Sequence, residues 1–247
     1  MDRDTARLPA MGEAIRMLMT ISTATLTSQL YKRNLHHAFI KGVYPMNPTR
    51  ARFVGEAYTL RLIPMREDRM RPEVVKSYEY PQRKCIESCP PGQVLVIDAR
   101  GVTDAGIFGD ILLIRLMKRG VAAVVSDGAM RDGEAIAKMD LPVFAAGPAA
   151  PLNLAAHFAP DLQQPIACGG VAVFPGDILV GDHDGVVVLP REMAPELAVE
   201  GAKQEHLEQF IQQRVLEGAS TAGTYPPNEE TMAAYARWCE MEKRTPR

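Results

Sequence analysis

Between residues 106 and 132, the apolar positions follow first a helical period and then a strand-like run. Glycines open this segment, Asp110 follows them, and apolar residues at helical spacing continue to about residue 119. An acid in the first turn and bases in the last turn agree with the helix macrodipole. After Gly120, the β-branched run Val121–Val125 has the length of a buried strand. The pattern predicts a helix and a strand, which together form half of a βαβ unit.

Other short apolar or alternating runs predict the remaining strands. They are Phe53–Leu62, Val94–Asp98, Leu141–Ala146, Gly169–Phe174, Ile178–Gly181 and Val186–Leu189. The sequences Pro-Gly-Asp and Asp-His-Asp-Gly join the last three strands, and both are typical of tight hairpins. Asp182 and Asp184 suggest a metal site, but a turn that needs aspartate and glycine explains them better.

Helical patterns lie mainly at the two ends of the chain. They are Met1–Leu30, a helix and a loop within residues 66–91, a short helix near Glu134–Lys138, Pro195–Leu216 and Glu229–Glu242. Gly218 marks the end of the helix that begins near Pro195. We interpret the chain as one domain with three parts: an N-terminal helical cap (1–45), an α/β core (46–190) and a C-terminal helical arm (191–247).

The composition excludes several classes of partner. The 247-residue chain is 47% hydrophobic and 23% charged, as in ordinary globular domains. Its 28 basic and 30 acidic residues give a net charge of −2, so no overall field attracts nucleic acid or an anionic membrane. No apolar run is long enough to span a bilayer and no signal peptide follows Met1, so we expect a cytoplasmic protein. The four cysteines lack further ligands at zinc spacing, and we expect reduced thiols.

Candidate chemistry gathers at the two ends of the 106–132 segment. The helix leads away from the carboxyl edge of the sheet and the strand returns to it, so Asp110 can face Arg131 and Asp132. A helix N-terminus and an arginine fork both suit carboxylate or enolate oxygens. The two carboxylates offer hard oxygen ligands for Mg²⁺ or Mn²⁺. These residues favour a small 2-oxo acid chelated to a divalent metal, and the alternative is an ordinary helix followed by a surface Arg-Asp pair.

The order Asp, twenty residues, Arg-Asp resembles the RraA-like family, which contains the class II 4-hydroxy-4-methyl-2-oxoglutarate / 4-carboxy-4-hydroxy-2-oxoadipate aldolases. Asp110, Arg131 and Asp132 carry this hallmark. Further matches are Leu141-Pro142-Val143-Phe144, Cys168-Gly169-Gly170-Val171, Pro175-Gly176-Asp177 and the stretch from Gly181 to Val186. The resemblance covers residues 23–190, with a weaker tail to about Pro227.

The resemblance implies an α/β fold: a β/β/α sandwich of the swivelling type with flanking N- and C-terminal helices. It implies that Arg131 binds the pyruvyl unit and stabilises its enolate, and that Asp132 ligates the metal. Asp110 helps to hold metal-bound water. The backbone amides of Gly109, Asp110, Ile111 and Leu112 receive the substrate carboxylate.

The resemblance also assigns residues outside this segment. A glutamate of the long C-terminal helix reaches the site of a neighbouring subunit, and Glu208 is the best match, with Glu205 in reserve. Thr25 and Ser28 lie in the region that selects the variable end of the substrate, although helix capping explains both residues better.

The function expected from the resemblance is a metal-dependent lyase that cleaves a 4-hydroxy-2-oxo acid to pyruvate, with oxaloacetate decarboxylation as a side activity. The family implies a homotrimer or homohexamer, and a small 2-oxo acid rather than nucleic acid or membrane as partner. Two alternatives remain: a non-catalytic regulator that binds a ribonuclease or helicase, and another enzyme of 2-oxo or sugar acids.

Overall fold

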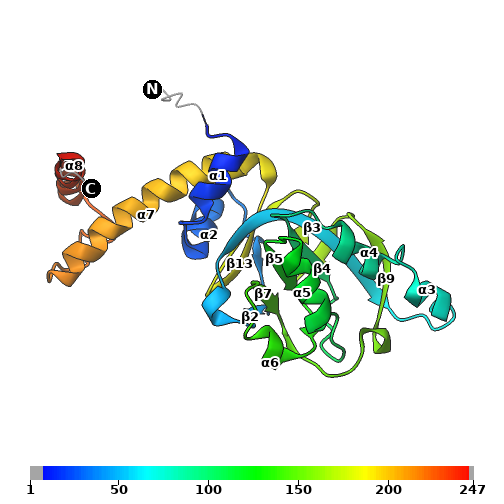
Figure 1. Cartoon of the computed structure of the whole chain (residues 1–247). Helices are drawn as coiled ribbons and strands as arrows, with labels where there is room; N and C mark the ends of the chain where they lie inside the picture. Colours follow the sequence, from blue (N-terminus) through cyan, green and yellow to red (C-terminus); the bar gives the residue numbers. More distant parts are fainter. Residues whose placement is uncertain (1–7, 245–247) are drawn as a thin grey trace.

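The computed structural model describes residues 8–244, so the first residues of the predicted N-terminal helix and the last of the C-terminal arm lie outside it. A central sheet is flanked by helices, and one long helix projects from the body of the molecule (Figure 1). The predicted α/β class with flanking helices is confirmed.

Nine strands of the described residues form the central sheet, in the order β1-β13-β12-β3-β4-β5-β7-β2, with β9 also paired to β3. The strands β3, β4, β5 and β7 are parallel. The sheet consists of β1 (Phe39–Ile40), β2 (Tyr44–Pro45), β3 (Phe53–Pro64), β4 (Val94–Asp98), β5 (Ala123–Ser126), β7 (Val143–Ala145), β9 (His157–Leu162), β12 (Ile178–Asp182) and β13 (Gly185–Leu189).

Two smaller pairs of strands complete the β-structure. β6 (Ala129–Met130) is parallel to β8 (Gly147–Pro148), and β10 (Ile166–Cys168) is antiparallel to β11 (Val171–Val173). The second pair corrects a sequence prediction. The Pro-Gly-Asp sequence makes no hairpin, because β11 pairs with β10 while β12 lies between β3 and β13. The Asp-His-Asp-Gly hairpin between β12 and β13 is confirmed.

The helices agree with the prediction in place but differ in length. They are α1 (Met11–Leu18), α2 (Thr23–Tyr31), α3 (Pro72–Lys76), α4 (Pro81–Ser88), α5 (Asp110–Lys118), α6 (Gly133–Ile136), α7 (Ala194–Leu216) and α8 (Glu229–Arg244), with 3₁₀ turns at Pro48–Arg50, Asn153–Ala155 and Arg191–Met193. The N-terminal helix is two helices, and the segment 1–45 also supplies β1 and β2. None of the described helices is long and apolar enough to cross a membrane.

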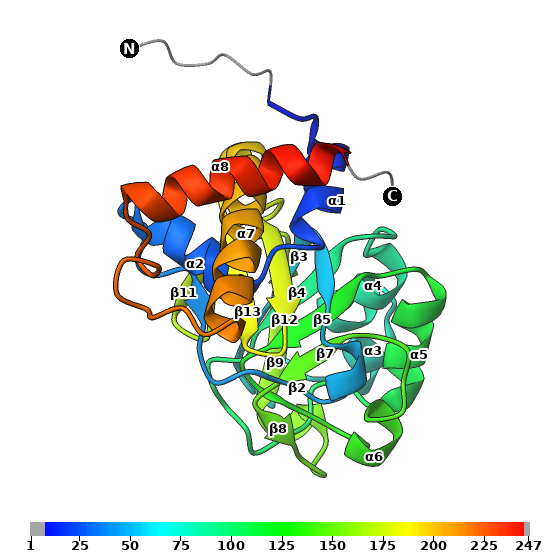
Figure 2. The same ribbon diagram turned by 90° about the vertical axis from the view of Figure 1, so that its left-hand side faces the viewer.

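The central strands are buried on both faces, as parallel strands usually are. On β4, Leu95 and Ile97 pack with helices α4 and α5, whereas Val94 and Val96 pack with β10 and β11 on the other face. A third cluster of buried side chains joins α1, α2 and α7 to β12 and β13. The helices α1 and α7 therefore lie together over the end of the sheet that contains β12 and β13 (Figure 2).

Hydroxyls and acids near the start of α2 hold this helical cap in place. Ser22 caps the helix by accepting from the Thr25 amide at 3.1 Å, and Ser28 donates to a backbone carbonyl in its own helix. Asp182 accepts from the amide and hydroxyl of Thr23, both at 2.7 Å. The capping role expected for Thr25 and Ser28 is therefore wrong, because Ser22 caps α2 and Ser28 bonds within the helix. The structural interpretation of Asp182 is supported by its contacts.

Candidate active site

Short backbone pairings place Arg131 and Asp132 beside the start of α5. The Arg131 amide donates to the Phe108 carbonyl at 2.8 Å, and the Ile107 amide donates to the Ala129 carbonyl at 2.9 Å. On the other side, β6 pairs with β8. The segment that ends at Asp132 is therefore held between the residues before α5 and those around Pro148.

Two glycines allow this close approach. A Cβ atom on Gly106 would overlap the backbone and side chain of Arg131. A Cβ atom on Gly109, the N-cap of α5, would overlap Oδ2 of Asp132. Gly109 was among the predicted site residues but Gly106 was not, because only the folded chain brings Arg131 against it.

The two aspartates meet at the N-terminus of α5. Asp132 has φ 57° and ψ 45°, a left-handed conformation that aspartate adopts more easily than most residues. Its Oδ2 lies 3.4 Å from the Asp110 amide, and Oδ1 of Asp110 accepts from the Ile111 amide at 2.7 Å. The first amides of the helix thus already face carboxylate oxygens, which is the ligand type that a helix N-terminus favours.

Arg131 faces a cavity of about 210 Å³ next to this corner. The cavity is lined by Tyr80, Gln82, Arg83, Ile86, Gly106, Ile107, Gly109, Leu112, Arg131, Leu152, Asn153 and Leu154. Nε of Arg131 is buried, and among the described residues no acceptor or acid pairs with the guanidinium. A partly buried guanidinium without a partner favours an anionic ligand.

The structure therefore unites most of the predicted site residues. Arg131, Gly109 and Leu112 line one cavity. Asp110 and Asp132 lie beside it, at the N-terminus of α5. Ile111 contributes its amide, while its side chain is 76% exposed and points away from the core. Gln82 and Asn153 also line the cavity, and neither was predicted because neither belongs to a recognisable motif.

The donor set in this corner suits a hydrated divalent ion. No group of three or more His, Cys, Asp or Glu side chains among the described residues is arranged to hold a metal. Asp110 and Asp132 offer two carboxylates, and neither forms an ion pair within the described chain. Mg²⁺ commonly keeps several waters and uses only one or two carboxylates, so these two residues fit such an ion.

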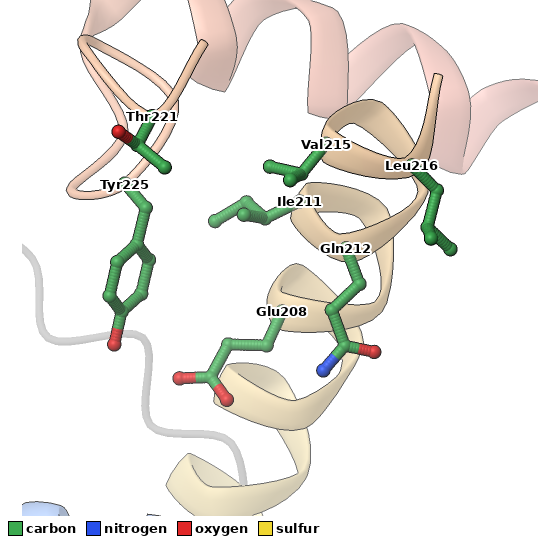
Figure 3. Close-up of a pocket in the computed structure, with 7 residues that line it drawn as sticks. All are labelled: Glu208, Ile211, Gln212, Val215, Leu216, Thr221 and Tyr225. Atoms are coloured by element: carbon green, nitrogen blue, oxygen red, sulfur yellow. The ribbon is translucent and has the colours of Figure 1, made fainter. Parts of the chain in front are cut away.

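Glu208 lies in a different place. It lines a cavity of about 570 Å³ between α7 and the segment 221–225, where its carboxylate lies across from Tyr225 (Figure 3). It accepts from Gln204 at 2.9 Å. The part of α7 that carries it projects away from α5 (Figure 1), so one chain does not bring Glu208 to Arg131.

Glu205, the reserve candidate, is engaged within its own subunit. Its Oε1 accepts from the amide of Ser22 at 2.9 Å and from the Ser22 hydroxyl at 2.8 Å. Partial burial raises the pKa of Glu205, but these hydrogen bonds and the charge of Arg52 outweigh it, and the net pKa is below its usual value. These contacts give Glu205 a structural role in docking α2 on α7.

A second hollow, of about 620 Å³, lies where β4 and β5 end, beside Asp98 and Asp127. Asp127 accepts from the amides of Ala99, Gly101 and Gly169 at 2.7 to 3.2 Å. Asp98 accepts from two other amides, and burial raises its pKa. Both carboxylates therefore hold loops in place through backbone amides, whereas Asp110 and Asp132 lie beside the cavity lined by Arg131.

Comparisons with known proteins identify the family of the chain. A family model described as RraA-like, Aldolase/RraA, matches residues 20–188, well over half of the chain. A protein of Halalkalibacterium halodurans with the provisional name 4-hydroxy-4-methyl-2-oxoglutarate aldolase is 35% identical over 133 residues, 54% of this chain and 62% of that protein. The chain thus spans less than two thirds of that relative. A 4-hydroxy-4-methyl-2-oxoglutarate aldolase of Thermus thermophilus is 33% identical over 57% of this chain and 77% of its own.

Solved structures give the same result for the fold. RraAS2 of Streptomyces coelicolor, described as an unusual member of the RNase ES inhibitor RraA protein family, superposes with a TM-score of 0.74 at 29% identity, over 84% of this chain and 98% of its own. A protein of Pseudomonas syringae pv. tomato has the same TM-score at 23% identity, over 87% of this chain and 97% of its own, which supports the fold alone. The family match, the shared fold and the corner formed by Asp110, Arg131 and Asp132 lead to one conclusion: the chain belongs to the RraA-like family.

Proposed function

We propose that the chain is a divalent-metal-dependent lyase that cleaves a 4-hydroxy-2-oxo acid to pyruvate and a second carbonyl compound. The observation that supports this proposal is an unpaired guanidinium, Arg131, beside a helix start that carries two carboxylates. The aldolase name of the Thermus thermophilus relative agrees with it. Arg83 lines the same cavity and forms no ion pair among the described residues, so it suits a second carboxylate of the substrate.

In this proposal, the 1-carboxylate of the substrate binds at the start of α5, where it replaces aspartate oxygens at the amides of Asp110 and Ile111. The fork of Arg131 binds the 2-oxo oxygen. Mg²⁺ or Mn²⁺, held by Asp132 and through water by Asp110, would supply Lewis-acid polarisation of the 2-oxo group.

Cleavage of the C3–C4 bond leaves its electron pair on the pyruvate fragment as an enolate. Arg131 stabilises the negative charge on the enolate oxygen. The proton of the 4-hydroxyl passes to a water held by Asp110, and the second product leaves as a carbonyl compound. C3 of the enolate then takes up a proton to give pyruvate. Oxaloacetate decarboxylation passes through the same enolate, and we expect it as a side activity.

The test is pyruvate release from 4-hydroxy-2-oxo acids and from oxaloacetate, measured with Mg²⁺ and again with EDTA. The proposal expects release with Mg²⁺, its loss in EDTA, and recovery when Mn²⁺ is added in excess. No pyruvate from any of these acids, with any of these ions, contradicts the proposal. That outcome would favour a non-catalytic regulator, the class to which the name of the Streptomyces coelicolor relative points.

The change Gly109→Ala tests the contact between α5 and Asp132. The added Cβ overlaps Oδ2 of Asp132, so the carboxylate must move away from the helix start. We expect pyruvate release to fall by about tenfold or more while the fold persists, since the overlapping atom belongs to an exposed side chain. Gly12→Ala is the matched control, because no atom lies within 4 Å of its added Cβ. Equal activity of the two variants would refute the contact's role.

The proposal includes assembly of the chain as a trimer or hexamer in which Glu208 of one copy lies near the cavity of another. Its support is the projection of α7 away from the body of the subunit (Figure 1). We expect analytical ultracentrifugation to give three or six copies. We also expect Glu208→Gln to lower pyruvate release about tenfold. Glu217→Gln, which changes the residue directly after α7, should leave pyruvate release unchanged. A monomer, or equal activity of both variants, would remove Glu208 from the site.

A further inference from the structure

Gln82 and Asn153 line the Arg131 cavity and form a directed hydrogen-bond chain. Nε2 of Gln82 donates to the Ile107 carbonyl at 2.9 Å, and Nδ2 of Asn153 donates to Oε1 of Gln82 at 3.0 Å. A backbone carbonyl only accepts, so the amide nitrogen of Gln82 must face Ile107. Its oxygen must then face Asn153 and accept from it. The carbonyl of Ile107 thus fixes the orientation of both side-chain amides.

This orientation presents Oδ1 of Asn153 as an acceptor. The residue is only 8% exposed, and Oδ1 has no donor among the described residues. Buried polar atoms are nearly always hydrogen-bonded, because an unpaired one has lost its hydrogen bonds to water and gained none in return. Arg131, whose Nε is a buried donor without a partner, lines the same cavity. Asn153 and Arg131 therefore bring an unpaired acceptor and an unpaired donor to the wall of one cavity, where a ligand that carries both kinds of group would complete their hydrogen bonds.

We infer that Asn153 is a specificity-determining residue that accepts a hydrogen bond from the hydroxyl of a hydroxy-oxo acid while Arg131 binds an oxo or carboxylate oxygen. The inference rests on the proposed function for the identity of the acid. An amide oxygen is too weak a base to take the hydroxyl proton, so Asn153 orients this group and does not remove its proton. Gln82 acts through Asn153, as a positioning residue.

A preference for the hydroxylated acid is expected because only this acid can donate a hydrogen bond to Asn153. A hydroxylated acid satisfies Oδ1 of Asn153, whereas an acid with hydrogen in place of the hydroxyl leaves that oxygen buried and unpaired. Sites built to pair with a hydroxyl discriminate strongly against ligands that lack it. Asn153→Leu removes the acceptor at similar size and should remove the preference without weakening the unhydroxylated ligand.

The experiment compares two acids that differ only in this group, 4-hydroxy-2-oxoglutarate and 2-oxoglutarate. Calorimetry in EDTA measures their binding, so the readout does not depend on turnover. We expect the wild-type chain to bind the hydroxylated acid about tenfold more tightly or better. Asn153→Leu should bind both acids with the wild-type affinity for 2-oxoglutarate. Gln164→Leu, an exposed amide outside the cavity, should keep the preference.

Two results would overturn the inference: a wild-type chain without preference, or an Asn153→Leu variant in which the preference persists or both affinities fall equally. Asn153→Ala, which also removes the acceptor but adds no bulk, replaces the leucine variant if thermal unfolding shows a lost fold. A failure of the proposed function can be distinguished from a failure of this inference. A chain that releases no pyruvate yet prefers the hydroxylated acid keeps the inference, and a lyase without this preference keeps only the function.

Discussion

Arg131→Ala is expected to lower kcat for pyruvate release by about 10²- to 10³-fold, the usual cost of losing a donor that faces a developing oxyanion. The reason is that Arg131 lines the cavity with its Nε buried and forms no ion pair among the described residues, so no structural partner competes for its charge. Steady-state kinetics with a saturating 4-hydroxy-2-oxo acid measures the effect. A loss confined to KM would mean that Arg131 binds substrate and transition state equally.

Two further variants separate chemistry from folding. Arg131→Lys keeps the charge and most of the stem but lacks the planar fork, so we expect intermediate activity and a wild-type unfolding temperature. Arg16→Ala removes an exposed arginine of α1 that forms no ion pair among the described residues, and we expect full activity. Full activity in Arg131→Ala itself would remove this residue from the mechanism.

Asp132→Asn should have the second largest effect, a fall of about 100-fold in pyruvate release at low Mg²⁺ together with weaker metal binding. Asparagine has nearly the same shape and tolerates the left-handed backbone at this position, where φ is 57°. The change therefore removes a charge and a hard oxygen ligand while leaving the backbone in place. Titration of activity with Mg²⁺ and of binding with Mn²⁺ measures both effects.

The matched control is Asp184→Asn, which removes an exposed carboxylate from the turn between β12 and β13. It should leave the Mg²⁺ titration unchanged. If Asp132→Asn kept the wild-type response to Mg²⁺, Asp132 would not be a metal ligand, whatever the fate of the lyase assignment.

Local sequence signals predicted the part of the fold that surrounds the site. The helix at Asp110–Lys118 and the strand at Val94–Asp98 appear where the pattern placed them, because capping charges and β-branched runs act over a few residues. The juxtaposition of Asp110 with Asp132 was also predictable, since a helix and the strand after it return the chain to the same edge of the sheet.

Long-range pairing was not predictable in the same way. The hairpin expected at Pro-Gly-Asp is absent because β3, more than a hundred residues earlier, pairs with β12. The hydrogen bond from Asn153 to Gln82 joins a 3₁₀ turn to α4, across 71 residues of sequence. Neither residue has a local pattern that distinguishes it from an ordinary surface amide. The acceptor in the cavity could therefore be recognised only after the chain was folded.

The most direct test is a crystal structure of the chain with Mn²⁺ and oxalate, a planar dianion that resembles the pyruvate enolate. We expect the anomalous signal of Mn²⁺ beside the carboxylates of Asp132 and Asp110. Oxalate should lie between the guanidinium of Arg131 and the first amides of α5. The account would be contradicted if oxalate and Mn²⁺ bound instead in the hollow beside Asp98 and Asp127. It would also be contradicted if the guanidinium of Arg131 pointed away from both.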